Sequence, residues 1–486
     1  MTKDVEQYFS ILYDYFGEAY GIASKNRFVK EKYWNKVLEV YDPSLIIGVM
    51  DSLYDDLRKI DWGAQEQHIR NTGGLKVSYS GAVYGYLQDV PQTAQFLKKA
   101  SLYADTIILN DNILSELWSW QKKGKTGWEI SFPIVLSWAI DFLYLRGLFV
   151  SNMKIPVCSL APPLAWSHEK ESFFETADNL VHQNEILLGS RVFGRKFSSY
   201  EELTTFLKKI ASPEAFFSLA KDLSLLYDPN GVGISMTDFE GHKSYFETKY
   251  RRSFDDDEIY GSFLRGVYST AIYDLFYHGR FKSVIGTDFK GNWKSLIWLM
   301  QNSGMDLSTI AKAKVATRDS ALLHALQENV RWLGNIPLDR IEELRERGEL
   351  QDLRDLLGRN VKTIEEASDE EFFEVGQQVK YNIGQAIKKH SSEVQDLNEE
   401  YRKKYNLKIP SLIVTGALGI AAAISPPLAT VASVLGTTLG GTTVVEIIKD
   451  YQEKRNKIKE LQKKPVAMLF DAQSVDRSVS MFGFEG

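Results

Sequence analysis

One uncharged segment near the C-terminus limits what this chain can fold into. Residues 409–445 form a run of 37 positions without a charged side chain, which must be covered by protein or lipid rather than water. Pro426-Pro427 divides the run into arms of 15 residues (411–425) and 18 residues (428–445). Because two adjacent prolines end one helix and suit the start of the next, the sequence predicts an apolar helical hairpin. The residues expected to shape it are Gly416, Gly419, Pro426, Pro427, Gly436 and Gly440.

Two environments fit this hairpin. Basic flanks are expected if both ends stay on the cytoplasmic side of a membrane that the hairpin enters. Spanning a bilayer takes about 20 residues, which neither arm reaches, so permanent burial in a soluble domain explains the missing charges equally well. A hairpin that is sheltered at rest and released on activation satisfies both observations. The flanking basic residues are Lys404, Lys408, Lys454, Arg455 and Lys457.

The hairpin is expected to follow a long helix. After a charged helix over 339–357, apolar or semi-apolar positions recur from about Ser368 to Asn406 in steps of three and four, close to a heptad seam. At about 1.5 Å per residue this helix would be roughly 55–60 Å long. We therefore predict a stalk helix, the hairpin and a return helix within 338–464, with the return helix packed along the stalk and a tail at 465–486. The seam positions are 372, 375, 379, 383, 386, 390, 394, 397 and 401.

The first 330 residues are predicted to be a mainly helical sensor or regulatory region of one or two subdomains. Helical patterns recur up to 60 and again over 167–190, 201–226 and 258–300. Between 72 and 112, partial alternation and a short apolar run before Asn110-Asp111-Asn112 predict a small mixed α/β element. The predicted fold class is therefore mainly α, with that element and the C-terminal stalk and hairpin.

One apolar run in this region raises the question of a membrane span. It lies within 130–151 and is interrupted by Asp141 and Arg146 after 11 uncharged positions. That length suits a buried core helix better than a membrane-spanning helix.

Composition excludes several classes of protein. The chain has 58 Lys and Arg against 64 Asp and Glu, a net charge of −6, so no overall field attracts nucleic acid and no such partner is expected. The single cysteine, Cys158, rules out an internal disulfide framework and any multi-cysteine zinc site. Its apolar surroundings favour a packing thiol over a nucleophile. We assign no catalytic residue, metal ligand or cofactor from the sequence.

Three patterns match known functional motifs only in part. Gly124-Lys125-Thr126 is similar to the end of a phosphate-binding loop, but position 119, where that motif needs a glycine, is Ser. Acidic and histidine residues from His168 to Glu185 share one helical face, which fits a solvated surface better than a metal site. The acidic run Asp255–Glu258 fits a helix start or solvated loop better than a magnesium site.

Parts of the chain resemble uncharacterised bacterial proteins that are often encoded near phage-defence genes. The similar segments are Asn335–Arg345, Leu353–Leu357, the long helix with its small-residue hairpin, and Tyr103 to Asp111. Together they cover about a third of the chain. The resemblance implies a role in antiphage defence and names no catalytic residue.

Three hypotheses for function remain. The leading one is a non-enzymatic bacterial effector, cytoplasmic at rest, whose sheltered hairpin engages the inner membrane or a hydrophobic partner on activation. The second is a soluble scaffold or regulatory subunit in which the hairpin is a permanent helix-packing interface. The third is a metal-dependent hydrolase that uses Asp255–Glu258 or the face of His168–Glu185. A protein partner or self-association through the C-terminal helices is expected in the first two.

Overall fold

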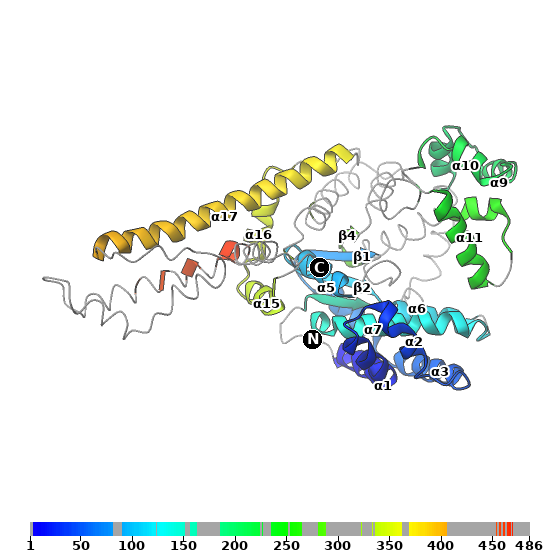
Figure 1. Ribbon diagram of the computed structural model, residues 1–486, viewed down its shortest axis with the longest axis horizontal. Coiled ribbons are helices and arrows are strands. Elements are labelled where there is room, and N and C mark those ends of the chain that lie inside the picture. The colour runs from blue at the N-terminus through cyan, green and yellow to red at the C-terminus, as the bar shows by residue number, and fades with distance from the viewer. Residues whose placement is uncertain are drawn as a thin grey trace. The chain divides into compact units, whose positions relative to one another are not determined.

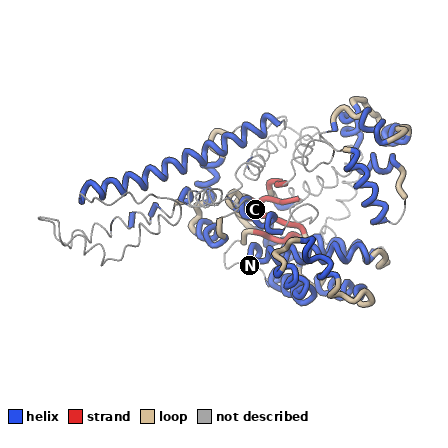
Figure 2. Tube along the Cα trace, viewed as in Figure 1, coloured by secondary structure: helices blue, strands red, loops and turns tan. Residues whose placement is uncertain are grey.

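The structure is a computed structural model of the chain, and helices predominate in the part that it describes (Figure 1, Figure 2). The predicted mainly α fold class is confirmed. The chain divides into two compact units, the first formed by Met1–His324 with Lys362–Phe373 and the second by Ala325–Val361 with Glu374–Gly486. The described residues are 3–80, 90–122, 124–150, 156–162, 185–223, 226, 235–250, 253–264, 280–287, 322, 333, 336–361, 369–405 and ten positions between 453 and 469.

The N-terminal helices surround an apolar core. They are α1 (Lys3–Lys25), α2 (Lys30–Leu38), α3 (Ile46–Leu57) and α4 (Trp62–Asn71), together with α6 (Asn112–Lys122) and α7 (Trp128–Phe149). Helix α1 buries one stripe against α7, where Tyr8, Phe9 and Phe16 are almost completely covered. Their rings meet Phe142, Phe149 and Phe132 at centroid distances of 5.4–6.5 Å, a favourable aromatic separation.

The apolar run within 130–151 forms most of helix α7. Within the described residues it is the one helix long and apolar enough to cross a membrane. Most of it is nevertheless buried against α1, α6 and the sheet. It is a core helix of the first unit, as its interruption by Asp141 and Arg146 predicts.

Among the described residues, four parallel strands form a sheet beside these helices. Its strands are β1 (Lys76–Ser80), β2 (Thr106–Asn110), β3 (Cys158–Ala161) and β4 (Val284–Thr287), in the order β3-β2-β1-β4. In register, Ser78 pairs with Ile108 and Val77 with Val284. The mixed element predicted at 72–112 contains β1, α5 (Val90–Ser101) and β2, but the sheet extends beyond it. The helical pattern expected over 258–300 is wrong at β4, because the strand gains its hydrogen bonds from β1, far away in sequence.

Helix α4 covers one face of the sheet. Gln65 donates from Nε2 to the Leu160 carbonyl at 3.1 Å, and the Lys76 ammonium donates to the Ile69 and Arg70 carbonyls at 3.1 and 3.0 Å. The lysine therefore satisfies carbonyls that the end of α4 leaves without an intrahelical partner. The buried residues packed together here are Ile69, Ile108, Ala161 and Phe281.

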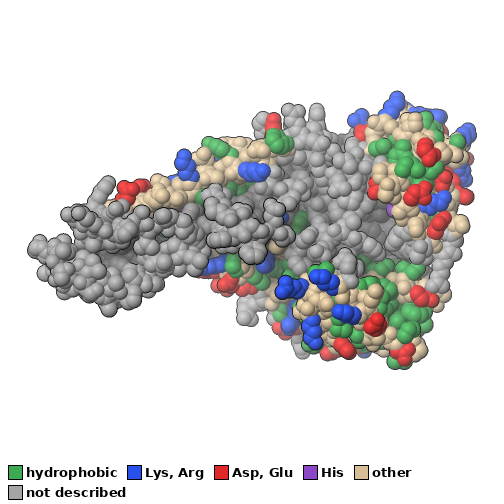
Figure 3. Space-filling view, in the orientation of Figure 1, with side chains coloured by type: hydrophobic (Ala, Val, Ile, Leu, Met, Phe, Trp, Pro, Cys, Tyr) green, Lys and Arg blue, Asp and Glu red, His purple; other side chains and the backbone are tan. Residues whose placement is uncertain are grey.

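Further helices of the first unit pack around phenylalanines. They are α9 (Tyr200–Lys208), α10 (Pro213–Leu219) and α11 (Met236–Tyr250), with helical residues at 185–193 and 256–264. Phe216 stacks on Tyr260 with ring centroids 4.5 Å apart. Ser199 and Ser212 accept hydrogen bonds from backbone amides at the starts of α9 and α10, as good N-cap residues do. Basic and acidic side chains are interspersed over the visible surface of these helices (Figure 3).

The second unit contains α15 (Leu338–Glu346), α16 (Leu350–Leu357) and most of the long helix α17 (Asp369–Tyr405). The single charged helix expected over 339–357 is two helices. The break lies at Gly348, whose φ of +72° is accessible to glycine but costly for other residues. Leu344, Leu350 and Leu353 are buried on both sides of it.

Candidate functional site

Helix α17 confirms the long helix predicted from about Ser368 to Asn406. It begins and ends within one residue of the predicted limits and appears as the long yellow-to-orange helix in Figure 1. Five predicted seam positions are buried, whereas Ala386 and Leu397 are only half-buried. Ile387 is also buried, so the covered stripe shifts by one residue near the middle of the helix. The buried seam residues are Val375, Val379, Ile383, His390 and Val394.

A polar residue in the seam attaches α17 to α16. Asn382 is 7% exposed and donates from Nδ2 to the carbonyls of Leu357 at 3.1 Å and Arg359 at 2.7 Å. Gln378 donates to Asn382 Oδ1 at 2.9 Å. Because a buried amide requires its partners, this arrangement fixes the register of α17 against the end of α16.

The return segment contacts α17 at one described point. Lys464 donates from Nζ to Glu393 Oε2 at 2.9 Å across 71 residues of sequence. Described positions from 453 to 469 are mostly helical, and Ala467 and Leu469 are buried. The ion pair itself is half-exposed and contributes little stability, but it shows which parts of the two segments meet.

All of the predicted hairpin residues, and most of the flanking basic residues, lie outside the described residues. This applies to Gly416, Gly419, Pro426, Pro427, Gly436 and Gly440, and to the flanking residues Lys408, Lys454 and Arg455. Lys404 lies in the last turn of α17. Lys457 pairs with Glu453 at 3.0 Å, and its side chain is about half-exposed.

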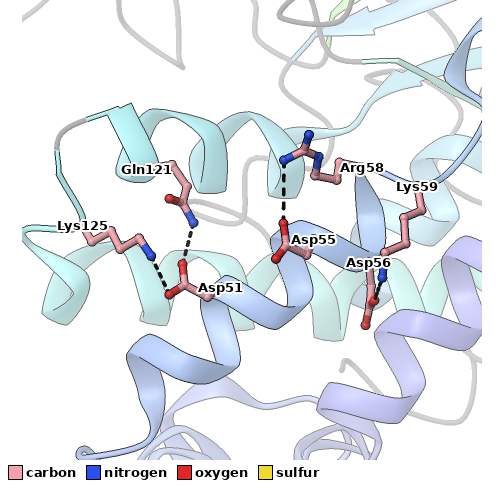
Figure 4. A network of polar contacts seen from close by, with 7 residues as sticks. All are labelled: Asp51, Asp55, Asp56, Arg58, Lys59, Gln121 and Lys125. Atoms are coloured by element: carbon pink, nitrogen blue, oxygen red, sulfur yellow. Dashed lines mark hydrogen bonds and ion pairs between the residues drawn. The ribbon is translucent and has the colours of Figure 1, made fainter.

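Lys125, in the segment Gly124-Lys125-Thr126 that is similar to the end of a phosphate-binding loop, forms a structural ion pair. It lies in the turn after α6 and donates to Asp51 Oδ2 on α3 at 2.7 Å, while Gln121 donates to the other oxygen at 2.6 Å (Figure 4). The preceding element is helix α6 rather than the strand that a phosphate-binding loop requires. Asp51 thus joins α3 to the end of α6.

The helical face from His168 to Glu185 is expected to be solvated, and this is wrong for Glu185. That side chain is 1% exposed, at the start of a described helical stretch. The wheel pattern places it among surface acids, but the fold covers it. The other residues of the face lie outside the described residues. Across the described ranges, no three His, Cys, Asp or Glu side chains gather as a metal site would require.

The acidic run Asp255–Glu258 lies at the start of the helical residues 256–264, as expected. Glu258 accepts from the Asp255 amide at 3.1 Å, a capping contact, and Asp256 pairs with Lys243 at 2.7 Å. These contacts orient two of the carboxylates toward partners within the fold.

We expect replacement of all four acids by Asn or Gln to leave function intact. Losing the cap and one part-exposed ion pair should lower the free energy of unfolding by no more than about 2 kcal/mol in total. Chemical unfolding and membrane fractionation of the same variant measure both effects. Loss of function in a variant that folds normally would instead favour the metal-dependent hydrolase.

A histidine and a serine form a contact that resembles a nucleophile and its base. His242 Nε2 lies 3.0 Å from Ser262 Oγ, and burial lowers the pKa of His242. Ser262, however, donates its hydroxyl proton to the Ile259 carbonyl at 2.7 Å. The imidazole must then donate to Oγ, which is the reverse of what activation of a nucleophile needs.

Cys158 is a buried residue of β3 and is 1% exposed. Its neighbour across the sheet is Ile107. This position agrees with the packing role expected from its apolar surroundings, since a reactive thiolate is normally accessible.

The carboxyl edge of the sheet contains a group that the sequence did not single out. Asp111 directly follows β2 and has no exposed surface. Its Oδ1 accepts from the Tyr8 hydroxyl at 3.0 Å and from the amides of Ile113 and Leu114 at 3.0 and 3.2 Å. Burial raises the pKa of Asp111 to about 7 and also raises the pKa of Tyr8. The signal available in the sequence is an acid immediately after a buried strand.

Comparison of the chain with protein-family models, curated proteins and solved structures finds no match.

Proposed function

We propose that this protein is a non-enzymatic bacterial effector whose segment 409–445 engages the inner membrane or a hydrophobic partner after a trigger. The observation that carries the proposal is the contact between Glu393 of α17 and Lys464 of the return segment. A chain that leaves along α17 and returns beside it supports a hairpin between the two. In this proposal residues 1–330 sense the trigger or hold the hairpin sheltered at rest.

The position of the uncharged segment supports this proposal. Helix α17 continues from Glu393 to Tyr405, about 18 Å beyond the ion pair, and the uncharged segment starts four residues later. Lys404 in the last turn and Lys457 in the return segment would lie near anionic headgroups if the hairpin inserts. The resemblance to proteins encoded near phage-defence genes makes antiphage defence the expected setting.

The scaffold is the main alternative, and one substitution separates it from the effector. A lysine at position 436 is costly in a bilayer, by roughly 2.5–3.5 kcal/mol at mid-depth, and also costly in a protein core. Melting temperature and membrane association must therefore be measured on the same Gly436→Lys variant. For a released hairpin we expect a nearly unchanged melting temperature and loss of membrane association.

Gly384→Lys is the matched control. Gly384 is an exposed position of α17, and a Cβ there would meet no atom within 4 Å. The same substitution should leave membrane association unchanged and should not lower the melting temperature, because lysine favours a helix more than glycine does. If Gly436→Lys lowers the melting temperature by several degrees while the wild-type protein never enters the membrane fraction, the hairpin is permanent core and the effector proposal fails.

A further inference from the structure

The connection between α1 and α2 has a cluster of basic residues that the hairpin proposal does not use. Residues 25–36 contain five basic residues and a single acid. Four of the basic side chains are described, and all four are exposed to solvent; they are those of Lys25, Arg27, Lys32 and Lys36. None of the four forms an ion pair with a carboxylate in the part of the chain that the structure describes, so their charges are available to a partner.

The fold brings these four residues to one place. Lys36 Nζ lies 3.5 Å from Oδ1 of Asn26, the residue between Lys25 and Arg27, so this lysine reaches back to the end of α1. Lys32 precedes Lys36 by one turn of α2, and side chains four residues apart share a helix face. The four residues therefore make one surface of a single sign, which we call the basic turn.

Arg27 occupies a position that glycine usually fills at this kind of helix end. Its amide donates to the Ser24 carbonyl and the Phe28 amide donates to the Ala23 carbonyl, each at 2.9 Å, which are the two hydrogen bonds of a Schellman motif. Arg27 has a φ of +55°, the left-handed conformation that favours glycine in this motif.

The strained conformation is explained for Phe28 but not for Arg27. Phe28 is also left-handed, with a φ of +58°, but it is 8% exposed and its ring lies 4.6 Å from that of Tyr144 between centroids. Burial of this ring offsets the strain. The exposed Arg27 side chain forms no hydrogen bond or ion pair with a described residue, and strain of this kind is concentrated at functional positions.

The basic turn fits anionic lipid better than nucleic acid. Single strands need exposed aromatic rings on which bases stack, whereas Phe28 and Tyr33 are buried and Trp34 is half-buried. The net charge of −6 would repel a long polyanion from the rest of the chain. A planar layer of headgroups meets only the local surface, where each lysine or arginine strengthens binding by roughly fivefold. We propose that the basic turn docks the protein on a membrane surface that contains anionic phospholipids.

This docking goes beyond the proposed function and differs from it physically. The basic turn belongs to the first unit, and attraction between exposed charges is reversible and screened by salt. Insertion of residues 409–445 would instead be held by burial of apolar surface, which salt does not screen. The two modes of membrane association are therefore separable in one protein.

The test uses the full chain with vesicles of phosphatidylcholine alone or with about 30% phosphatidylglycerol. We expect sedimentation with the anionic vesicles at low salt, and its loss at about 0.5 M salt. The triple variant Arg27→Gln, Lys32→Gln, Lys36→Gln should bind roughly 100-fold more weakly, at about fivefold per residue. Glutamine keeps the helix propensity of α2. The matched control removes as many charges from exposed lysines of the same unit and should bind as the wild type does; its changes are Lys196→Gln, Lys208→Gln and Lys209→Gln.

Arg27→Gly separates docking from folding. It removes one charge and gives the left-handed position to glycine, so binding should weaken roughly fivefold while the melting temperature does not fall. Equal binding by the triple variant and its control overturns the proposal, as does wild-type binding that depends on neither anionic lipid nor salt. Loss of binding to a short RNA duplex by the triple variant, with vesicle binding retained, also overturns it. Gly436→Lys leaves the basic turn intact, so its result bears on the hairpin alone.

Discussion

Arg280→Ala should lower the free energy of unfolding by about 3–5 kcal/mol, the largest stability effect that we expect from a single substitution. The Arg280 side chain is 3% exposed and that of Glu66 is 14% exposed. The guanidinium donates from Nε to Glu66 Oε1 at 2.9 Å and from Nη2 to Oε2, which is a two-point contact. Removing it leaves the Glu66 carboxylate largely buried, with Arg70 as its remaining ion-pair partner at 2.8 Å. Urea unfolding followed by circular dichroism measures the change.

The reason for so large an effect is the cost of a largely buried carboxylate that has lost its two-point partner, rather than the attraction within the pair. The combined variant Glu66→Gln, Arg280→Met should therefore be more stable than Arg280→Ala alone. Lys59→Ala removes an exposed ion pair with Asp56 on α3, and solvent screening should make its effect on stability far smaller. If Arg280→Ala lowered stability as little as Lys59→Ala does, the contact between Arg280 and Glu66 would not be what attaches α4 to the segment before β4.

Asp111 should make the stability of the first unit depend on pH. Burial raises its pKa in the folded protein to about 7, against an ordinary value of 3.8. The folded state therefore binds more protons than the unfolded state between these values, and stability falls as the pH rises through about 7. We expect the Asp111 contribution to decrease by about 2 kcal/mol between about pH 5.5 and about pH 8.5. Tyr8, whose pKa burial raises well above 10.0, remains protonated throughout.

Asp111→Asn isolates this contribution. The asparagine accepts the same three hydrogen bonds at Oδ1 but cannot ionise, so its unfolding free energy should change less with pH than that of the wild type. The wild type already loses stability above about pH 4, so the variant should be more stable at about pH 5.5, and its advantage should grow by about 2 kcal/mol by about pH 8.5. The comparison cancels the titration of histidines such as His242 and His390, whose pKa values burial lowers. Parallel pH profiles for the two proteins would refute the assignment.

The periodicity of the sequence determined the elements whose evidence is local. The steps of three and four from 368 to 406 predicted α17 to within one residue, because a helix forms hydrogen bonds only four residues apart and its buried stripe repeats with the same period. The sequence also predicted that α7 is a core helix, because its uncharged apolar run is too short to span a bilayer. The sequence analysis predicted one helix where there are two. The pattern is helical on both sides of Gly348, and the pattern alone does not show that this glycine adopts a left-handed conformation that ends the first helix.

Only the tertiary structure decided the pairing of the sheet and the state of its buried acid. Strands β3 and β4 are four residues each and join β2 and β1 across about 50 and 200 residues of sequence, a distance at which local pattern carries no information. The burial of Glu185 and the pKa of Asp111 depend on which parts of the fold cover each carboxyl group. Desolvation depends on all the atoms around a group. For this reason the sequence, which shows Asp111 between two polar residues, does not reveal that its carboxyl group is buried in the fold.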